Sequence, residues 1–358
     1  MNITIIGLGV IGGSLGLAIK QNIPSAVVTG YDADPVIEKA LNLNAVDFGA
    51  ASLPSAVADA DIVFLCLPVS GILSMLPRIA PHLRPGAVVT DVGSTKQDIV
   101  NAAKRCITAP AMFIGGHPMA GSEGKGIDFA DPLLFQNATY VLCVNPVKRT
   151  KTASLTTLLH RIGARVLFLS AKDHDTVAAM ISHLPQLLAV AMMNIVEKKS
   201  RRNPAYLQLA AGGFRDMTRI ASSPYEMWKD ILSHNSKEIT GVVREFRRLL
   251  EKFEHDLTFS QNAFAGRFVH AKQLRDAIPK NSKGFLHPLY DLLISVDDRS
   301  GVLAAITGSL SRAGINIKDI ELLKIRDGRG GTFRISFDTR KDARRAENVL
   351  KKIAITIL

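Results

Sequence analysis

The sequence Asn2-Ile-Thr-Ile-Ile6 runs directly into Gly7-Leu-Gly9-Val-Ile-Gly12, and this junction decides the fold. The first five residues are apolar and largely β-branched, which is typical of a buried strand, and a helix-compatible stretch follows from Gly13 to Gln21. A second strand is expected from Ala26 to Tyr31, and it ends at Asp32. Strand, glycine turn, helix, strand and acid in this order form the dinucleotide-binding fingerprint.

Each part of this fingerprint has a physical role. Gly7 permits a tight turn, Gly9 lets a pyrophosphate approach the backbone, and Gly12 lets the helix pack close to the strand. The amides at the start of the helix favour a phosphate group. Asp32 can accept hydrogen bonds from the ribose hydroxyls and would repel a 2′-phosphate, so NAD is predicted rather than NADP. The alternative is a glycine turn that serves packing alone. The predicted cofactor-binding residues are Gly7, Gly9, Val10, Ile11, Gly12, Asp32 and Pro68.

The alternation of strands and helices continues to about residue 170. Further strands are predicted at Asp61–Leu67, Gly86–Asp91, Met112–Gly115, Thr139–Asn145 and Ala164–Leu169. With the first two strands they predict a Rossmann-type α/β domain, residues 1–170, with a sheet of seven or eight strands. Ligands of open α/β sheets bind beyond the carboxyl ends of the strands, where Pro68, Ser94 and His117 fall.

His117 is the candidate general base. It follows a predicted strand and precedes Pro118, which would place the imidazole on a short turn at the ligand edge. Histidine titrates near neutrality, so His117 could take a proton from an alcohol while a hydride leaves the same carbon. Ser94 could orient the alcohol or His117, although Ser94-Thr-Lys-Gln97 also fits a helix cap, through Ser94 or Thr95. Lys96 could contact a substrate or cofactor charge, or simply be solvated.

A helical domain is predicted over residues 171–283. Ser170 and Asp173 can cap a long helix from Asp173 to Lys199 that Pro185 should kink. His183 and Gln186 lie three residues apart, hence on one face near the kink, where they could contact substrate or cofactor. A buried structural histidine is the alternative for His183.

The segment after this helix carries candidate anion ligands. Arg215 and Arg219 follow a Gly-Gly pair, and a carboxylate substrate needs the planar, permanently charged fork of an arginine. Asp216 could instead fix Arg219. The Gly-rich loop Gly121–Ile127 is predicted to be a flap, in which Glu123 could pair with an arginine. Trp228 is either core or a pocket wall.

Three further helices are predicted in this domain, and their apolar faces cannot all be covered within the chain, so a homodimer is expected. The helices are Tyr225–Ser233, Lys237–Asp256 and Ser260–Ala277. The pattern then changes at about residue 287. Residues 287–358 predict the order βαββαβ, a ferredoxin-like fold in which no residue has a catalytic pattern.

Composition narrows the class of protein. The chain has 358 residues, so two or three domains are expected. Its formal charge of +12 is spread over basic runs that alternate with acids, so a nucleic-acid partner is not predicted, and an acidic substrate accounts for part of the charge. Met1–Lys20 lacks the features of a signal peptide, and no other apolar run of about 18 residues is expected, so a cytoplasmic protein with no membrane contact is predicted. The three cysteines show no metal spacing, and no metal site is predicted.

Taken together, these motifs resemble the prephenate dehydrogenase family with a C-terminal ACT regulatory domain. The matching stretches are Gly7–Gly12, Asp91–Lys96, Gly116–Glu123, Ser182–Pro185 and Gly212–Ala221, and the ACT pattern is matched by Asp297–Leu303 and Ala313–Ile317. The resemblance implies that prephenate and NAD give 4-hydroxyphenylpyruvate, carbon dioxide and NADH. It also implies that tyrosine, the end product, binds at an interface between ACT domains and inhibits.

The resemblance assigns roles to matching positions. His117 would be the base on the ring hydroxyl, Ser94 its hydrogen-bond partner, and Arg219 the ligand of a substrate carboxylate. The other residues implied to lie at the substrate are Arg215, His183, Gln186, Ser122, Glu123 and Trp228.

Gln186 departs from the family, because many members have a second histidine there. This departure leaves an arogenate-using (cyclohexadienyl) dehydrogenase as an alternative. A β-hydroxyacid dehydrogenase would use a lysine in the middle of the interdomain helix, where this chain has none. A non-catalytic protein that senses NAD or an amino acid would have no need of His117, Ser94 and Arg219 together.

Overall fold

The computed structural model describes residues 1–121, 124–144, 152–259, 263–277, 289–326, 330–353 and 355–357. Its contacts divide the chain into two compact units, Met1–Ala265 and Gly266–Leu358. The predicted boundary at residue 170 lies inside the first unit and stays a prediction. The predicted boundary between residues 283 and 287 lies outside the described residues.

The first unit contains an eight-stranded sheet with the order β3-β2-β1-β4-β5-β6-β7-β8. Its strands are β1 (Asn2–Ile6), β2 (Val27–Tyr31), β3 (Phe48–Gly49), β4 (Ile62–Leu65), β5 (Val88–Asp91), β6 (Met112–Pro118), β7 (Thr139–Cys143) and β8 (Arg165–Leu169). All neighbours are parallel except β6 and β7. The central strands β4 and β5 are buried throughout, as the continuous apolar sequence of β4 predicts for that strand. The Rossmann-type sheet predicted from the sequence is confirmed.

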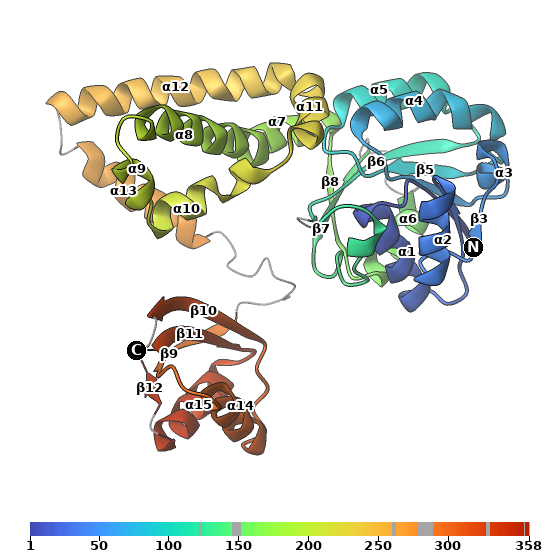
Figure 1. The fold of residues 1–358 in the computed structure, drawn as a ribbon. Helices are drawn as coiled ribbons and strands as arrows, with labels where there is room; N and C mark the ends of the chain where they lie inside the picture. The colour runs from blue at the N-terminus through green and yellow to red at the C-terminus, as the bar shows by residue number, and fades with distance from the viewer. Residues whose placement is uncertain are drawn as a thin grey trace. The chain divides into compact units, whose positions relative to one another are not determined.

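Helices cover both faces of this sheet (Figure 1). One face carries α1 (Val10–Asn22), α2 (Asp34–Asn42) and α6 (Ala153–Arg161), and the other carries α3 (Leu53–Val57), α4 (Val69–Ile79) and α5 (Gln97–Cys106). Each face has its own apolar core, one built around Leu15 and Leu158 and the other around Ile72 and Ile99. The short turns η1 (Ala80–His82) and η2 (Ile127–Phe129) join these elements. Two separately packed faces hold the carboxyl ends of the strands in fixed positions.

A helical region follows within the first unit. It consists of α7 (Ala171–Ala178), the π-helical turn η4 (Ala179–His183), α8 (Leu184–Ser200), α9 (Ala205–Gln208), α10 (Gly212–Thr218), the 3-10 turn η5 (Arg219–Ser222), α11 (Tyr225–His234) and α12 (Ser236–Phe259). Helix α13 (Ala263–Ala277) crosses the boundary of the two units. A small core that includes Ala179, Leu184, Ile239 and Val242 packs α12 against η4 and α8.

The predicted helix from Asp173 to Lys199 is interrupted rather than continuous. Ser170 caps its start, as predicted, by accepting a hydrogen bond from the Asp173 amide at 3.0 Å. The interruption is η4, directly before Pro185. Proline lacks the amide hydrogen that an α-helix would use, and a π-helical turn accommodates the break. The π-helical interruption therefore ends at His183, one of the predicted site residues.

The segment Ala171–Ser200 is long and apolar enough to cross a membrane, alone among the described residues. The expectation that no such run follows residue 20 was therefore wrong. The segment nevertheless buries the polar side chains of His174, Asp175, His183 and Gln186 within the first unit. Four buried polar side chains do not suit a membrane span, for which a single helix of this kind is weak evidence.

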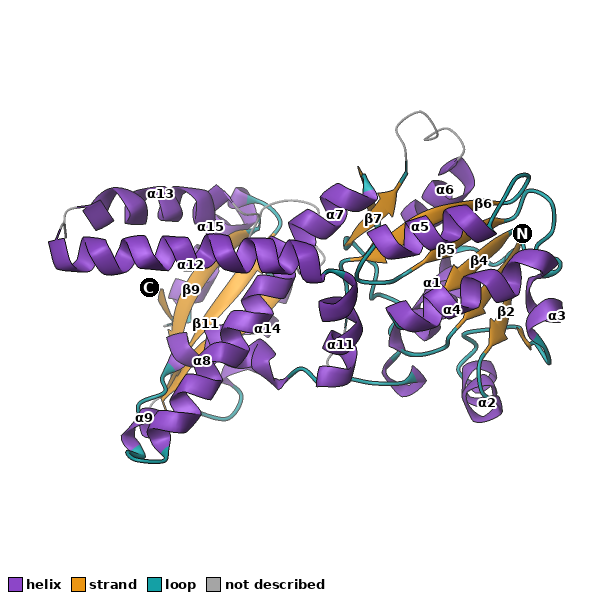
Figure 2. Cartoon of the chain, turned by 90° about the horizontal axis from the view of Figure 1, so that it is seen from above, coloured by secondary structure: helices purple, strands orange, loops and turns teal. Residues whose placement is uncertain are grey.

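The second unit contains a four-stranded antiparallel sheet with the order β10-β11-β9-β12. Its elements are β9 (Tyr290–Val296), α14 (Val302–Arg312), β10 (Asp319–Arg326), β11 (Gly330–Phe337), α15 (Arg340–Lys352) and β12 (Thr356–Ile357). Strands β9 and β11 lie side by side (Figure 2), and a core that includes Ile294, Ile306 and Leu350 joins the sheet to the helices. The predicted ferredoxin-like order is confirmed, and residues 327–329, between β10 and β11, lie outside the described residues.

Candidate functional site

The glycine turn after β1 has the shape that a dinucleotide requires. Gly7 has a φ of +92°, which favours glycine, and a Cβ at Gly12 would collide with the carbonyl oxygen of Gly7. Gly9, by contrast, has open space around its Cα, with nothing within 4 Å of an added Cβ. This free approach lies at the N-terminus of α1, where backbone amides can bind a pyrophosphate.

The other predicted cofactor residues surround this turn. Asp32 directly follows β2 and accepts hydrogen bonds from the amides of Leu8 at 2.6 Å and Ala33 at 2.7 Å. Val10 and Ile11 begin α1, and Pro68 precedes α4 after the neighbouring strand β4. Strand β1 pairs with both β2 and β4, so these residues lie where the strand order of the sheet reverses. The shape of the turn fits a dinucleotide such as NAD, and the contact of Asp32 with the ribose stays a prediction.

His117 lies within a strand, not on the turn predicted from the sequence. Strand β6 continues to Pro118 because the antiparallel strand β7 pairs with it, and His117 lies opposite Val141. A Cβ at Gly116 would collide with the carbonyl oxygen of Asp91, so this glycine permits the close approach of β6 to β5. The hydrogen bonds between β6 and β7 therefore hold the backbone of His117 on one side, and this sets the position of its side chain.

A buried ion pair supports this strand. Lys96 and Asp91 are both 0% exposed and paired with each other. The Lys96 ammonium also donates to the carbonyl oxygen of Gly116 at 2.7 Å, while Asp91 accepts from the amides of Gly116 at 3.0 Å and Gly93 at 2.9 Å. The sequence analysis offered two roles for Lys96, a solvated side chain or a contact with a ligand. In the structure its ammonium is instead buried against Asp91 and Gly116. Its charge is neutralised by Asp91, and the pair holds the residue before His117.

His117 contacts a second histidine that the sequence reasoning missed. Its Nδ1 lies 2.7 Å from Nε2 of His174, whose own Nδ1 lies 2.8 Å from Asp175 Oδ1. Asp175 also accepts hydrogen bonds from the amides of Lys96 at 2.7 Å and Gln97 at 2.8 Å, at the start of α5. Burial is the main reason that the pKa of His117 lies well below its ordinary 6.5, and the nearby charge of Lys96 lowers it further. The imidazole is therefore neutral at neutral pH.

Asp175 takes the place of the helix cap predicted at Ser94 or Thr95. The first amides of α5 point to its carboxylate, and the Thr95 hydroxyl is buried with no hydrogen-bond partner in the described part of the chain. Ser94 is half-buried in the loop between β5 and α5. The capping pattern was misread because a carboxylate distant in the sequence competes successfully for these amides.

A second polar group forms around His183. Its ring is buried, and its Nδ1 lies 3.2 Å from Nδ2 of Asn235, which also donates to the carbonyl oxygen of Asp175 at 2.9 Å. The ring of Trp228 meets it edge to face, with centroids 5.9 Å apart. Burial is the main reason that the pKa of His183 falls to about 4; nearby His174 lowers it further, and Asp175 opposes the shift. Asn235 is a further residue that the sequence reasoning missed.

The remaining predicted substrate residues differ in their surroundings. Gln186 is buried in the first turn of α8, close to His183 in sequence. Arg215 and Arg219 are exposed, and the Arg215 Nε donates to the carbonyl oxygen of Ala210 at 3.0 Å. Ser122 and Glu123 lie outside the described residues, so the proposed flap contact stays a prediction.

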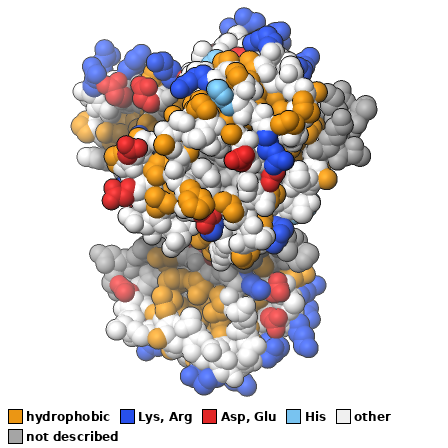
Figure 3. All heavy atoms as spheres, turned by 90° about the vertical axis from the view of Figure 1, so that its right-hand side faces the viewer, with side chains coloured by type: hydrophobic (Ala, Val, Ile, Leu, Met, Phe, Trp, Pro, Cys, Tyr) orange, Lys and Arg blue, Asp and Glu red, His pale blue; other side chains and the backbone are white. Residues whose placement is uncertain are grey.

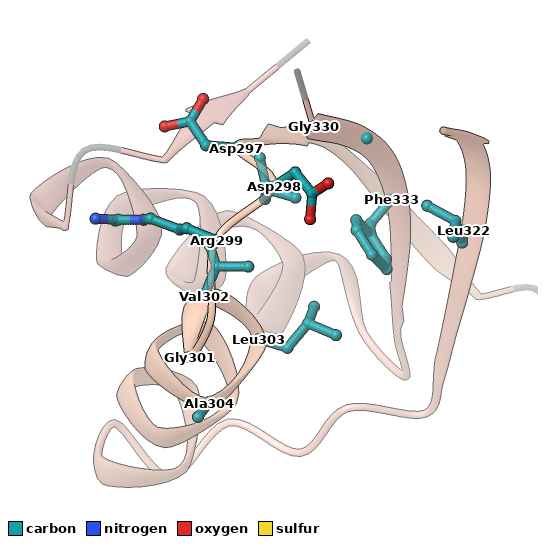
Figure 4. A pocket seen from close by; sticks show the side chains of 12 residues that line it. Asp297, Asp298, Arg299, Gly301, Val302, Leu303, Ala304, Leu322, Gly330 and Phe333 are labelled. Carbon is teal, nitrogen blue, oxygen red and sulfur yellow. The ribbon is translucent and has the colours of Figure 1, made fainter. Parts of the chain in front are cut away.

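The C-terminal unit has a cavity of its own, of about 440 Å³. It lies where β9 leads into α14, beside β10 and β11, and Figure 4 shows the side chains of Leu303, Leu322 and Phe333 around it. Asp298 reaches the same space, whereas Arg299 points away. Gly301 precedes α14 with a φ of +83°, so the first amides of that helix adjoin the cavity.

A Rossmann-type sheet, a dinucleotide turn and a half-buried neutral histidine on the same sheet define a nicotinamide-dependent dehydrogenase. Three family models match the chain: the nucleotide-binding domain of prephenate dehydrogenase over residues 15–168, its dimerization domain over 170–266, and the ACT domain over 290–355. The chain belongs to the prephenate dehydrogenase family.

Individual relatives agree with this assignment. The chain is 37% identical over 356 residues to the prephenate dehydrogenase of Bacillus subtilis (strain 168), covering 98% of this chain and 95% of that one. The arogenate dehydrogenase of Synechocystis has a TM-score of 0.69 at 31% identity, covering 77% and 99% of the two chains. The prephenate dehydrogenase of A. aeolicus, solved with hydroxyphenyl propionate and NAD+, has a TM-score of 0.68 at 26% identity, covering 77% and 97%. The predicted fold class and cofactor are confirmed.

Proposed function

We propose that the protein catalyses the NAD-dependent oxidative decarboxylation of prephenate to 4-hydroxyphenylpyruvate in tyrosine biosynthesis. The observation that carries this proposal is the neutral, half-buried His117 on the sheet that also bears the dinucleotide turn. The match of both prephenate dehydrogenase domain models supports the same reaction.

In this proposal His117 is the general base. NAD, when bound between the glycine turn and Asp32, supplies the hydride acceptor. His117 takes the proton of the ring hydroxyl while the ring carbon becomes a carbonyl carbon, and Ser94 orients the hydroxyl by a hydrogen bond. The carboxylate then leaves as carbon dioxide, its bonding electrons enter the ring, and aromatisation drives the step. A base of low pKa keeps its lone pair available at neutral pH.

The acidic groups of the substrate need cationic and polar ligands. Arg219 is proposed to bind a carboxylate in a bidentate manner, with Arg215 nearby. His183, with its lone pair on Nδ1 directed to Asn235, can donate from Nε2. Gln186 and Trp228 would complete the pocket, together with Ser122 and Glu123 on the flap.

Prephenate is proposed as the preferred substrate over arogenate. Prephenate carries a keto group where arogenate carries an ammonium group, and the near-complete match to the Bacillus subtilis relative favours the former. The resemblance to the Synechocystis arogenate dehydrogenase, together with Gln186 in place of a second histidine, favours arogenate as the second candidate.

The test is NADH formation with each substrate. Wild-type protein should oxidise prephenate more efficiently than arogenate, and His117→Asn should lose a hundredfold or more in kcat, about the contribution of a general base. NAD binding by the variant, measured by fluorescence titration, serves as the control for folding. Oxidation of neither substrate by protein that still binds NAD would contradict the proposal and favour a sensor. Full activity of His117→Asn would remove His117 as the base.

Tyrosine is proposed as the effector of the ACT domain. The apolar side chains at the C-terminal cavity suit a phenol ring, Asp298 suits the ammonium group, and the first amides of α14 suit the carboxylate. An interface between two ACT domains would enclose such a ligand further. Phe333→Ala should raise the tyrosine concentration needed for half inhibition about tenfold, with uninhibited activity unchanged. Absence of any tyrosine inhibition in the wild type would contradict this assignment.

A cytoplasmic homodimer is proposed as the form of the protein. Large apolar side chains that are more than half exposed occur on the helices of the dimerization-domain match: Ile181, Ile195, Leu209, Met217, Leu257 and Phe259. So many exposed apolar side chains in one region suit an obligate interface. On the face that Figure 3 shows, basic side chains lie in separate groups with acidic ones between them, which suits a small anionic substrate better than a nucleic acid.

A further inference from the structure

Behind the imidazole of His117 lies a chain of hydrogen bonds that ends at a buried carboxylate. We propose that His174 and Asp175 are positioning residues, which fix the tautomer of His117 and stabilise the positive charge that this base acquires. The inference rests on the proposed function for its kinetic part, but its structural part concerns His117 alone.

The direction of the hydrogen bonds follows from the end of the chain. An ionised carboxylate can only accept, so Asp175 requires a hydrogen on the Nδ1 of His174. A neutral His174 then has its lone pair on Nε2, which lies 2.7 Å from Nδ1 of His117. His117 must therefore carry its hydrogen on Nδ1 and its lone pair on Nε2. Only one tautomer of the base satisfies all the contacts.

The carboxylate is well anchored for this role. Asp175 is completely buried and accepts from the amides of Lys96 and Gln97, while its own carbonyl oxygen accepts from Asn235. Burial raises its pKa, but the hydrogen bonds from His174 and the two amides outweigh burial, so the net pKa is lowered. Asp175 is thus ionised at neutral pH, and its position is set by α5 as well as by its own helix α7.

The same chain can respond when the proton of the substrate arrives. The O–H bond of the substrate breaks and a bond forms between that hydrogen and Nε2 of His117, leaving a cationic imidazolium. Its Nδ1–H then donates a charge-assisted hydrogen bond to His174, whose far side is polarised by Asp175. No proton has to leave His117 along the chain during the step.

Other charged or titratable groups near His117 also influence its pKa. They are Lys96 with its partner Asp91, His183 on η4, and the proposed pair itself on α7. If His174 were cationic, it would repel the charge on His117, and its removal would raise the pKa of the base. If His174 is the neutral acceptor proposed here, its removal lowers the pKa of the base. The two arrangements predict opposite movements of the pH profile.

The first experiment reads the tautomer directly and needs no substrate. Nitrogen NMR of protein with labelled histidine should show Nδ1 of His117 protonated and Nε2 unprotonated at neutral pH, with His117→Asn used to assign the signal. His174→Phe should abolish this preference, and His174→Gln, whose side-chain oxygen can still accept from Nδ1, should restore it. A His117 protonated on Nε2 in the wild type would overturn the proposal, whatever reaction the protein catalyses.

The second experiment reads the consequence for the reaction. In His174→Phe, kcat should fall about tenfold to a hundredfold, as for other groups that orient a reacting residue from behind, and the acid limb of kcat/KM should move to lower pH. His174→Gln should recover part of the rate. The matched control is His234→Phe, because His234 makes an equivalent contact to Asp98 at 2.8 Å, away from His117. An unchanged profile in His174→Phe, or an acid limb at higher pH, would overturn the proposal.

Discussion

The region behind His117 and the segment of α10 and η5 that carries Arg215 and Arg219 differ in burial and in hydrogen bonding. Behind His117, the side chains of Asp91, Lys96 and Asp175 are fully buried and joined by hydrogen bonds from several parts of the first unit. By contrast, Arg215 and Arg219 are exposed on a helix of seven residues and a turn of four.

This difference separates two tasks of the site. A base must hold one geometry before the substrate arrives, and buried, mutually satisfied polar groups provide such preorganisation. A ligand for a carboxylate can remain solvated until the substrate or a second subunit orders it. We therefore expect substitutions in the first region to act on stability and kcat, and substitutions in the second to act on KM.

The largest effect is expected from breaking the buried ion pair. Asp91→Asn removes the partner of the Lys96 ammonium, which has no access to water, and should lower the free energy of unfolding by about 3–5 kcal/mol. The measurement is urea denaturation at neutral pH. The control is Glu251→Gln, which breaks the exposed pair with Arg247 at 3.4 Å and should change stability little. Equal losses in the two variants would mean that the buried region is no more preorganised than the surface.

The next effect is a loss of stability in acid caused by His183. The pKa of this group is about 4 in the folded chain and 6.5 ordinarily, so the unfolded chain binds more protons between these values. Its contribution is complete above about pH 6.5 and is lost as the pH falls toward 4. At about 1.4 kcal/mol for each pKa unit, the loss is roughly 3 kcal/mol.

His183→Gln removes this titration, so its unfolding free energy should fall less between about pH 7 and about pH 4 than that of the wild type. Substitution of the exposed His160 by Gln provides the control and should leave the wild-type slope unchanged. A wild-type slope in His183→Gln would show that the buried ring does not resist protonation.

A smaller effect, mainly on KM, is expected from substitutions of the exposed arginines. Arg219→Lys keeps the charge but loses the bidentate fork, so the KM for prephenate should rise about tenfold to a hundredfold with a smaller change in kcat. Arg215→Lys is the comparison, because the Nε of Arg215 donates to the carbonyl oxygen of Ala210 and so has a structural contact of its own. If kcat fell and KM were unchanged in Arg219→Lys, the arginine would belong with the preorganised region instead.

The contrast between the two regions also explains what the sequence could predict. The fingerprint from Asn2 to Gly12, seven strands of the large sheet and the βαββαβ order depend on local patterns, and these predictions of the fold were confirmed. The two-residue strand β3 has too few residues for a periodic pattern and was missed.

The polar network could not be predicted in the same way, because its members meet only after folding. His174 lies 57 residues from His117 in the sequence, and Asp175 lies 79 residues from Lys96, whose amide donates a hydrogen bond to it. The strand position of His117 depends on antiparallel pairing with β7, which leaves no local signal around Pro118. The one available signal was a His-Asp pair at the start of a helix otherwise rich in apolar residues. Burying such a pair is costly unless its polar atoms form hydrogen bonds.

The smallest effect expected concerns cofactor choice at the edge of the sheet, where Asp32 is partly exposed and yet bonded to the glycine turn. Asp32→Asn keeps an oxygen that can accept from Leu8 but removes the charge that repels a 2′-phosphate. The ratio of kcat/KM for NAD to that for NADP should fall about fivefold to tenfold, which corresponds to about 1 kcal/mol. Asp34→Asn removes the same charge two residues further on, at the exposed start of α2, and should leave the ratio unchanged. An equal fall in both variants would mean that general surface charge, rather than contact of Asp32 with the ribose, selects the cofactor.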